Sequence, residues 1–167
     1  QDLLVLAVFL ATAVLLSQLL GRTRTALSAA QQREHEALRL YEFSTALAGQ
    51  QTDESIAHTV AQYALETMQA DRVEVLIEGF GDRPASSVAL PADRSTAPDR
   101  PPTLIAPLLT ARGLQGEIRL WLEQAALTTT EDRWLKTLAN QGALAVERSH
   151  LARLERRARV AEESDQL

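Results

Sequence analysis

The feature that most constrains this chain is an apolar stretch near its start. From Leu3 to Leu20 no residue carries a charge over eighteen positions. As an α-helix this stretch is about 27 Å long, close to the roughly 30 Å of hydrocarbon in a bilayer. Because Asp2 precedes it and Arg22 and Arg24 follow it, we expect residues 1–21 to form a transmembrane helix and the residues after Arg22 to be cytoplasmic.

A signal peptide and a buried helix of a soluble core are the alternatives to a membrane helix. A signal peptide places basic residues before the apolar stretch and a small-residue cleavage site after it, and the sequence has neither. A buried core helix is compatible with the length, since eighteen residues is near the lower limit of a membrane span. The complete absence of charge favours the membrane interpretation.

Length, charge and composition limit the number of domains and exclude several classes of function. The 167 residues are enough for one compact domain with extensions. The net charge of −5 and the pI of about 5.2 argue against a nucleic-acid partner, which requires a concentrated basic face. The chain has no cysteine, so disulfides, cysteine-based zinc sites and thiol catalysis are excluded.

Two helices are expected before the first strand. The first ends before residues 49–51 and has an apolar stripe spaced i, i+3 and i+7: Leu40, Phe43 and Leu47. Thr52 is a suitable N-cap for the second helix, and Asp53 and Glu54 are favourable in its first turn. This helix runs to about residue 69, and its apolar stripe consists of Ile56 or Ala57, Val60, Ala64 and Met68.

The apolar pattern then changes from a helical period to alternation, which predicts strands. The first strand has Val73, Val75 and Ile77 on one face and ends at Gly79. Residues 87–90 are a weaker candidate for a second strand. Together they predict a sheet that begins directly after the second helix.

A proline-rich loop leads from these strands to a hairpin. Residues 91–102 contain four prolines and predict an irregular loop. Leu104 to Leu109 is a third strand, and Pro107 within it predicts a sheet edge or a bulge. A tight turn at Arg112-Gly113 joins it to an antiparallel fourth strand, Leu114 to Glu123.

The rest of the chain is expected to form one long helix. Thr129 and Asp132 fit a capping box, and only Gly142 departs from helical composition before Leu167. Such a helix is roughly 55 Å long, more than a small domain needs. Its first half is expected to pack on the sheet through Trp134, Leu135, Leu138, Leu144 and Val146. Its more charged second half carries a short heptad seam spaced 3-4-3: Leu151, Leu154, Ala158 and Ala161.

Three stretches resemble the KdpD-type potassium sensor histidine kinases. Residues 40–48, LYEFSTALA, are similar to the lead-in helix of that family, which runs close to LYELSRALA. Residues 4–20 resemble its fourth membrane helix. Residues 138–148, LANQGALAVER, resemble the closing helix of its GAF domain, LANQIALALER.

A fourth resemblance lies in the hairpin. Residues 106–108, APL, with Gly113 and Gly116 resemble a GAF strand pair that runs VPL, a turn, then GVL. The resemblance implies an α/β fold: a GAF-like antiparallel sheet backed by helices, with an N-terminal transmembrane helix and a long C-terminal signalling helix. The domains it implies are a transmembrane helix at 1–21, a linker and lead-in helix at 22–48, a GAF-like domain at 49–150, and at 151–167 a signalling helix toward a kinase core.

The resemblance also implies a function. The chain would be the signal-transmitting region of a two-component sensor histidine kinase of the cell inner membrane, which senses potassium or osmolarity and regulates potassium-uptake genes. It would dimerise through its N- and C-terminal helices. The parent kinase core would use ATP and Mg²⁺ and pass the phosphoryl group to a response regulator. The short region 79–102, and Glu117 where the family has an apolar residue, favour a mechanical coupler over a small-molecule binder.

The histidines do not form a catalytic or metal site in the sequence. A phospho-accepting histidine of this class is followed by an acid and, a few residues on, by proline. His35 has the acid but not the proline, and His150 is followed by Leu151. We interpret both, and His58, as exposed helix histidines that are too scattered to bind a metal.

Other polar or aromatic candidates also have structural interpretations. Gly79-Phe80-Gly81 is too short for a nucleotide-binding box and predicts a turn. Ser86 and Ser87 have no neighbouring His and Asp to activate them. Trp121 points away from the apolar face of its strand and is expected to pack under a helix. We therefore expect no catalytic, cofactor-binding or metal-binding residue here, and neither ATP binding nor phosphate incorporation.

Two other classes of protein stay open at this stage. One is a ligand-binding GAF module of a different membrane receptor, such as a cyclic-dinucleotide enzyme. The other is a membrane-anchored dimerisation protein without an enzyme. A histidine followed by an acid shortly after Leu167 would indicate the kinase.

Overall fold

The computed structural model describes residues 34–79, 84–92, 100–123 and 127–164. The chain divides into two compact units, Gln1–Glu42 and Phe43–Leu167. Of the first unit, residues 34–42 are described and are helical. The expected transmembrane helix at residues 1–21 lies outside the described residues. Among the helices that are described, none combines the length and the apolar character that a membrane span requires.

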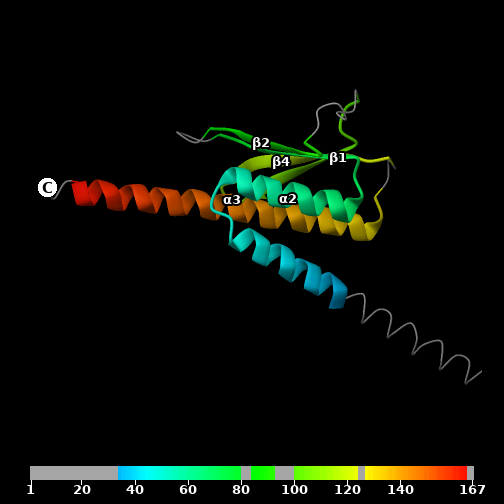
Figure 1. Cartoon of the computed structure of the whole chain (residues 1–167), viewed down its shortest axis with the longest axis horizontal. Coiled ribbons are helices and arrows are strands. Elements are labelled where there is room, and N and C mark those ends of the chain that lie inside the picture. The colour runs from blue at the N-terminus through cyan, green and yellow to red at the C-terminus, as the bar shows by residue number, and fades with distance from the viewer. Residues whose placement is uncertain (1–33, 80–83, 93–99, 124–126, 165–167) are drawn as a thin grey trace, which may run out of the picture. The chain divides into compact units, whose positions relative to one another are not determined.

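A four-stranded antiparallel sheet forms one layer of the second unit (Figure 1). Its strands are β1 (Arg72–Ile77), β2 (Ser86–Leu90), β3 (Leu104–Thr110) and β4 (Gly113–Trp121), in the order β2-β1-β4-β3. The predicted antiparallel sheet is confirmed, including the weak second strand and the β3–β4 hairpin.

The position of Pro107 agrees with its chemistry. β3 is an edge strand of the described sheet, and its pairing with β4 shifts register between Leu108 and Leu109. A proline cannot donate to a sheet ladder, so edges and irregular positions accommodate it. The sequence predicted either a sheet edge or a bulge at Pro107, and β3 has both an edge position and an irregular register.

Two helices cover one face of the sheet. α2 (Asp53–Met68) packs mainly over β1 and β2, and α3 (Thr129–Ser164) mainly over β3 and β4. The two helices also contact each other, and Figure 1 shows them side by side beneath the sheet. Residues 43–48 are helical as well and contribute Phe43 and Leu47 to the core.

The core lies between the sheet and these helices. Each strand contributes alternate residues to it, as the period of two requires. The buried residues of the sheet face are Val73, Val75, Ile77, Ala106, Leu108, Ile118 and Leu120. The buried residues of α2 include the whole predicted stripe: Ile56, Ala57, Val60, Ala64 and Met68.

α3 begins with a different capping box from the one predicted. The N-cap is Thr128, whose backbone N–H donates to Glu131 Oε2 at 2.7 Å while Glu131 N–H donates to Thr128 Oγ1 at 3.3 Å. Thr129 is therefore the first residue of the helix, not its N-cap. Glutamate reaches back to the cap where the shorter Asp132 does not, and Asp132 instead binds Lys136 Nζ at 2.6 Å.

The capping box also sets the titration of Glu131. The hydrogen bonds from the backbone and then the hydroxyl of Thr128 hold the pKa of the Glu131 carboxyl below its usual 4.5. A carboxyl with a lowered pKa stabilises the folded state above its unfolded pKa. This contribution is lost as the pH falls through the folded pKa of Glu131.

The expectation for Leu144 is wrong, because this side chain is 49% exposed. The residues of that turn that face the core are Ala143, Ala145 and Val146. The cause is Gly142, which faces α2 so closely that a Cβ there would lie 3.0 Å from Val60 Cγ2. This contact fixes the rotation of α3 and turns Leu144 outward.

Trp121 does not pack under α2 or α3, the helices that cover the other face of the sheet. It is 8% exposed, but it alternates with the buried Leu120 and so lies on the opposite face of the sheet. Its indole Nε1–H donates to the carbonyl oxygen of Arg100 at 2.8 Å. β4 also ends here, two residues before the predicted Glu123, because the next N–H, that of Leu122, donates to the Thr103 hydroxyl at 3.1 Å.

Gly116 is the position of the sheet least able to accept a side chain. It pairs with Ile77 and Leu108, and a Cβ built on it would lie 2.0 Å from the carbonyl oxygen of Leu76. We predict that Gly116→Ala lowers the free energy of unfolding by about 4 kcal/mol or more, because backbone atoms of β1 have to move. Urea denaturation followed by circular dichroism measures it.

Gly113→Ala is the matched control. Gly113 also has a positive φ, +117°, but a Cβ there meets no atom within 4 Å. Gly113→Ala is expected to lower the free energy of unfolding by about 1 to 2 kcal/mol, from backbone strain alone. Equal losses for the two variants would contradict the assigned contact between β4 and β1.

Candidate signal-coupling site

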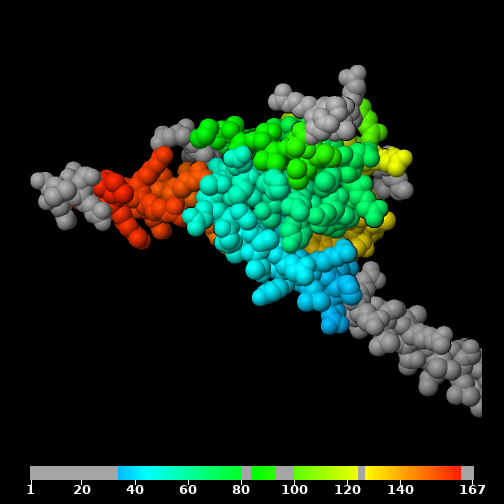
Figure 2. All heavy atoms as spheres, in the orientation of Figure 1, coloured from blue at the N-terminus to red at the C-terminus, as the bar shows by residue number. Residues whose placement is uncertain are grey.

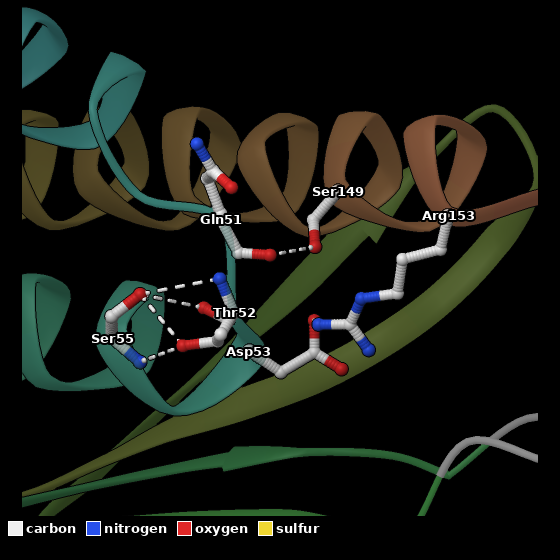
Figure 3. Close-up of polar contacts among 6 residues, drawn as sticks. All are labelled: Gln51, Thr52, Asp53, Ser55, Ser149 and Arg153. Carbon is white, nitrogen blue, oxygen red and sulfur yellow. Dashed lines mark hydrogen bonds and ion pairs between the residues drawn. The ribbon is translucent and has the colours of Figure 1, made fainter. Parts of the chain in front are cut away.

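Three consecutive residues, Gln51 to Asp53, join the elements of the domain at the place where α3 leaves the sheet (Figure 3). They follow the helical residues 43–48 and precede α2. Each of the three makes a different polar contact, and together they contact α2 and α3. This junction is the candidate functional site.

The helix before the junction is fixed in the core and closed by its own backbone. Phe43 is 0% exposed, and its ring centroid lies 5.0 Å from that of Tyr63 on α2. The Gln50 backbone N–H donates to Leu47 O at 3.1 Å, and its side-chain Nε2 donates to Ala46 O at 3.2 Å. These bonds satisfy carbonyl groups that the end of a helix leaves without intrahelical partners.

Thr52 connects the junction to α2, because it is the N-cap residue of that helix. Ser55 N–H donates to Thr52 Oγ1 at 3.2 Å, and Thr52 N–H donates back to Ser55 Oγ at 3.3 Å. This reciprocal pair is a capping box, and it confirms the predicted N-cap. The first turn of α2 is therefore fixed relative to residue 52.

Gln51 and Asp53 bind α3 from either side of this cap. Ser149 Oγ–H donates to the carbonyl oxygen of Gln51 at 3.0 Å. One turn later, Arg153 Nη2 lies 3.2 Å from Asp53 Oδ1, and the Asp53 side chain is only 7% exposed. Figure 3 shows both α3 side chains directed at the junction.

These two contacts lie at the last turns of α3 that the domain covers. Ser149 and Arg153 continue the core-facing side of the helix, since they lie three and seven residues after the buried Val146. From Leu154 to Glu162 every residue is exposed, and in Figure 2 the orange part of α3 projects from the packed body. The site therefore sets the rotation of the helix at the point where it leaves the domain.

Sequence reasoning identified part of this site. It placed Thr52 at the N-cap and Asp53 in the first turn of α2, where an acid is favourable. It did not identify Gln51, Ser149 or Arg153 as contacts. A signal was present, because Ser149 and Arg153 extend the helical phase of the buried α3 residues into a polar sequence.

The face of the sheet opposite the helices is held by its own polar side chains. Arg119 Nε donates to Glu117 Oε1 at 2.6 Å, and Arg119 Nη1 lies 3.5 Å from Glu74 Oε2. Ser87 Oγ–H donates to Glu74 Oε1 at 3.3 Å. These contacts cross β2, β1 and β4, so charged groups occupy the centre of this face.

The histidines that the sequence singled out lie apart from the junction. His35 and His58 are exposed. The expectation that His150 is exposed is wrong: it is half-buried and lines a hollow of about 220 Å³ with Glu78, Arg112 and Glu147. In this hollow Arg112 Nε binds Glu147 Oε1 at 3.0 Å. Across the described part of the chain, no group of three or more His, Cys, Asp or Glu residues is placed to hold a metal ion.

The other sequence candidates have structural surroundings. Ser86 and Ser87 lie on β2, and Ser87 contacts Glu74 rather than a histidine. Gly79 follows the end of β1. The remainder of its glycine-containing turn, residues 80–81, lies outside the described residues.

Among solved structures, GAF domains resemble this chain. The GAF domain of the potassium sensor histidine kinase KdpD from Escherichia coli has a TM-score of 0.56 and 21% identity, over 71% of this chain and 98% of that one. The GAF domain of the Acinetobacter phosphoenolpyruvate-protein phosphotransferase has a TM-score of 0.56 and 8% identity, over 70% and 95%. No protein family and no curated protein matches the sequence. The expected GAF-like fold is confirmed, and at these identities the likeness establishes the fold alone.

The contact between Arg153 and Asp53 yields a test of the site. We predict that Arg153→Gln lowers the free energy of unfolding by about 2 kcal/mol, because it removes the guanidinium that faces a buried carboxylate. The value is below that of a fully buried pair, since the Arg153 side chain is 35% exposed. Denaturant titration of both proteins measures it.

Lys136→Gln is the charge-matched control on the same helix. Its ion pair with Asp132 is exposed, with 71% and 50% of the two side chains accessible. Lys136→Gln is expected to lower the free energy of unfolding by less than about 0.5 kcal/mol. If Arg153→Gln is no more damaging than Lys136→Gln, the junction does not hold α3 in the way described.

Proposed function

We propose that this chain is the signal-transmitting region of a membrane-bound, KdpD-like sensor histidine kinase, and that its GAF domain is a mechanical coupler. One observation carries the proposal. The junction at Gln51 to Asp53 ties the helix of residues 43–48 to α3 at Ser149 and Arg153, where α3 leaves the domain. A movement of the helix of residues 43–48 would therefore be transmitted to α3 through short, directional bonds.

The exposed side of α3 supports an assembly through this helix. Leu144, Leu151 and Leu154 are 49%, 36% and 46% exposed. Leu144, Leu151 and Ala158 repeat every seven residues, and so do Leu154 and Ala161. Such a repeat is typical of a two-stranded coiled coil. We propose that two copies pair along this seam, which begins one heptad earlier than the sequence predicted because Leu144 belongs to it.

The sheet supports a coupler more than a receptor for a small apolar ligand. Ligand sites are mostly apolar hollows with a few polar groups. The centre of the sheet face opposite α2 and α3 instead carries the ion pairs of Arg119 with Glu74 and Glu117. This arrangement favours mechanical coupling over the alternative of a ligand-binding module of another receptor.

The remaining parts of the proposal rest on the resemblance to the KdpD family. They are a membrane helix at residues 1–21, an inner-membrane location with the GAF domain in the cytoplasm, and potassium or osmolarity as the stimulus. The parent kinase core would use ATP and Mg²⁺ and pass a phosphoryl group to a response regulator. None of these activities is assigned to residues of this chain.

The dimer is tested by charging the seam. Leu151→Asp with Leu154→Asp is expected to weaken self-association at least tenfold, because each places a carboxylate against its symmetry mate. Sedimentation velocity of the full chain in a non-ionic detergent measures it. Leu114→Asp is the control, since Leu114 has the same 46% exposure as Leu154 but lies on β4. Equal effects of the two changes would contradict pairing along α3.

The coupling is tested by changing the phase of α3 in the full-length parent kinase. One residue rotates an α-helix by about 100°, and seven residues restore nearly the same face. Deleting one residue between Arg153 and Ala161 is expected to fix autophosphorylation high or low without unfolding the domain. Inserting seven residues there should leave it responsive to the stimulus. If output does not depend on phase, α3 is a passive tether and the coupler proposal fails.

A further inference from the structure

A second hollow lies directly beside the signal-coupling site, between the loop at residues 48–51 and one side of α3. Its volume is about 220 Å³. The residues that line it are Ala48, Gln50, Gln51, Ala145, Arg148, Ser149, Ala152 and Arg156. None of these lining residues carries a negative charge, and two carry a positive charge.

Small residues make the room for this hollow. Ala48, Ala145 and Ala152 present only methyl groups to it. Arg148 and Arg156 stand one turn before and one turn after Ala152, so they are about 12 Å apart along the helix axis. Two arginine side chains at this spacing are long enough to reach a single anion placed over Ala152.

These two guanidinium groups are available for a ligand. Four other arginines of the domain have a carboxylate partner within ion-pair distance: Arg100, Arg112, Arg119 and Arg153. Arg148 and Arg156 have no carboxylate partner within ion-pair distance among the described residues. Both arginines are exposed, so water and salt screen part of the repulsion between their charges, and an anion bound between them removes the remainder.

Gln51 adds a polar group on the loop side. Its backbone carbonyl accepts from Ser149, and its side-chain amide makes no hydrogen bond to a described residue. Figure 3 shows this side chain directed across α3 in this view, away from the Asp53 contact. The amide N–H₂ is therefore a third donor beside the two guanidinium groups.

We propose that this hollow is a binding site for a phosphate-bearing anion. Arginine recognises phosphate through paired, charge-assisted hydrogen bonds. An anion held by Arg148, Arg156 and Gln51 ties the loop to α3 beside the Ser149 bond and so strengthens the junction. If the domain is a coupler, as proposed above, the anion is a regulator that restrains the movement of α3.

The binding is tested by isothermal titration calorimetry of the full chain in a non-ionic detergent. Sodium pyrophosphate is the probe, in a buffer without other phosphate. The expected result is one saturable site per chain. Arg148→Gln and Arg156→Gln are each expected to raise the dissociation constant about tenfold or more, since each removes a charge-assisted contact.

Arg133→Gln is the matched control. Arg133 is an exposed arginine of α3 that does not line the hollow, and its loss changes the net charge by the same amount. It is expected to leave the dissociation constant within about twofold of the parent value. Absence of saturable binding up to on the order of 10 mM, or equal weakening by Arg133→Gln, would overturn the site.

A second probe distinguishes the sources of the phosphate. Dihexanoyl phosphatidylglycerol, below its micellar concentration, presents the same chemistry as a lipid headgroup. Tighter binding of pyrophosphate indicates a soluble phosphate compound, and tighter binding of the lipid indicates a membrane headgroup. Both results support the site. Because binding is measured on the chain itself, its failure leaves the coupler proposal standing, and a failed phase series leaves the binding result standing.

Discussion

The rotation of α3 about its axis is the constraint on which the rest of the structure depends. It is fixed where Gly142 meets Val60 of α2, so closely that a Cβ on residue 142 would lie only 3.0 Å from Val60 Cγ2. This rotation buries one side of the helix against the sheet and directs Ser149 and Arg153 at the junction about two and three turns later. The same rotation turns Leu144 and the seam that follows it to the opposite side.

Apolar burial and polar contacts have different roles in this arrangement. Burial of the helix faces provides most of the stabilising free energy, and the close fit at Gly142 sets the rotation of α3 within the domain. The hydrogen bond at 3.0 Å and the ion pair at 3.2 Å hold that rotation at the end of the domain, because hydrogen bonds weaken steeply as their geometry changes. The pair of Asp53 and Arg153 contributes modest net stability because both charges lose solvation. Its importance lies in defining one position of α3 relative to residues 51–53.

The GAF fold does not by itself determine what this domain does. A shared fold supports many functions, and function depends on particular sites. Here the face of the sheet opposite α2 and α3 carries the chain's own ion pairs around Arg119. The open polar hollow lies instead between the loop at 48–51 and α3. This hollow has Arg148 and Arg156 in its lining and adjoins the junction of Gln51 to Asp53 with α3.

The sequence by itself determined the elements and much of the core. Periods of 3.6 and of two identified α2, α3 and all four strands, and local chemistry identified the cap at Thr52 and the edge position of Pro107. These features depend on residues close together in the chain. The contact of Asp53 with Arg153 joins residues one hundred positions apart, and the outward direction of Leu144 depends on Gly142 meeting another helix. Only the tertiary structure decided these, because no local pattern records how one helix is rotated against its neighbours.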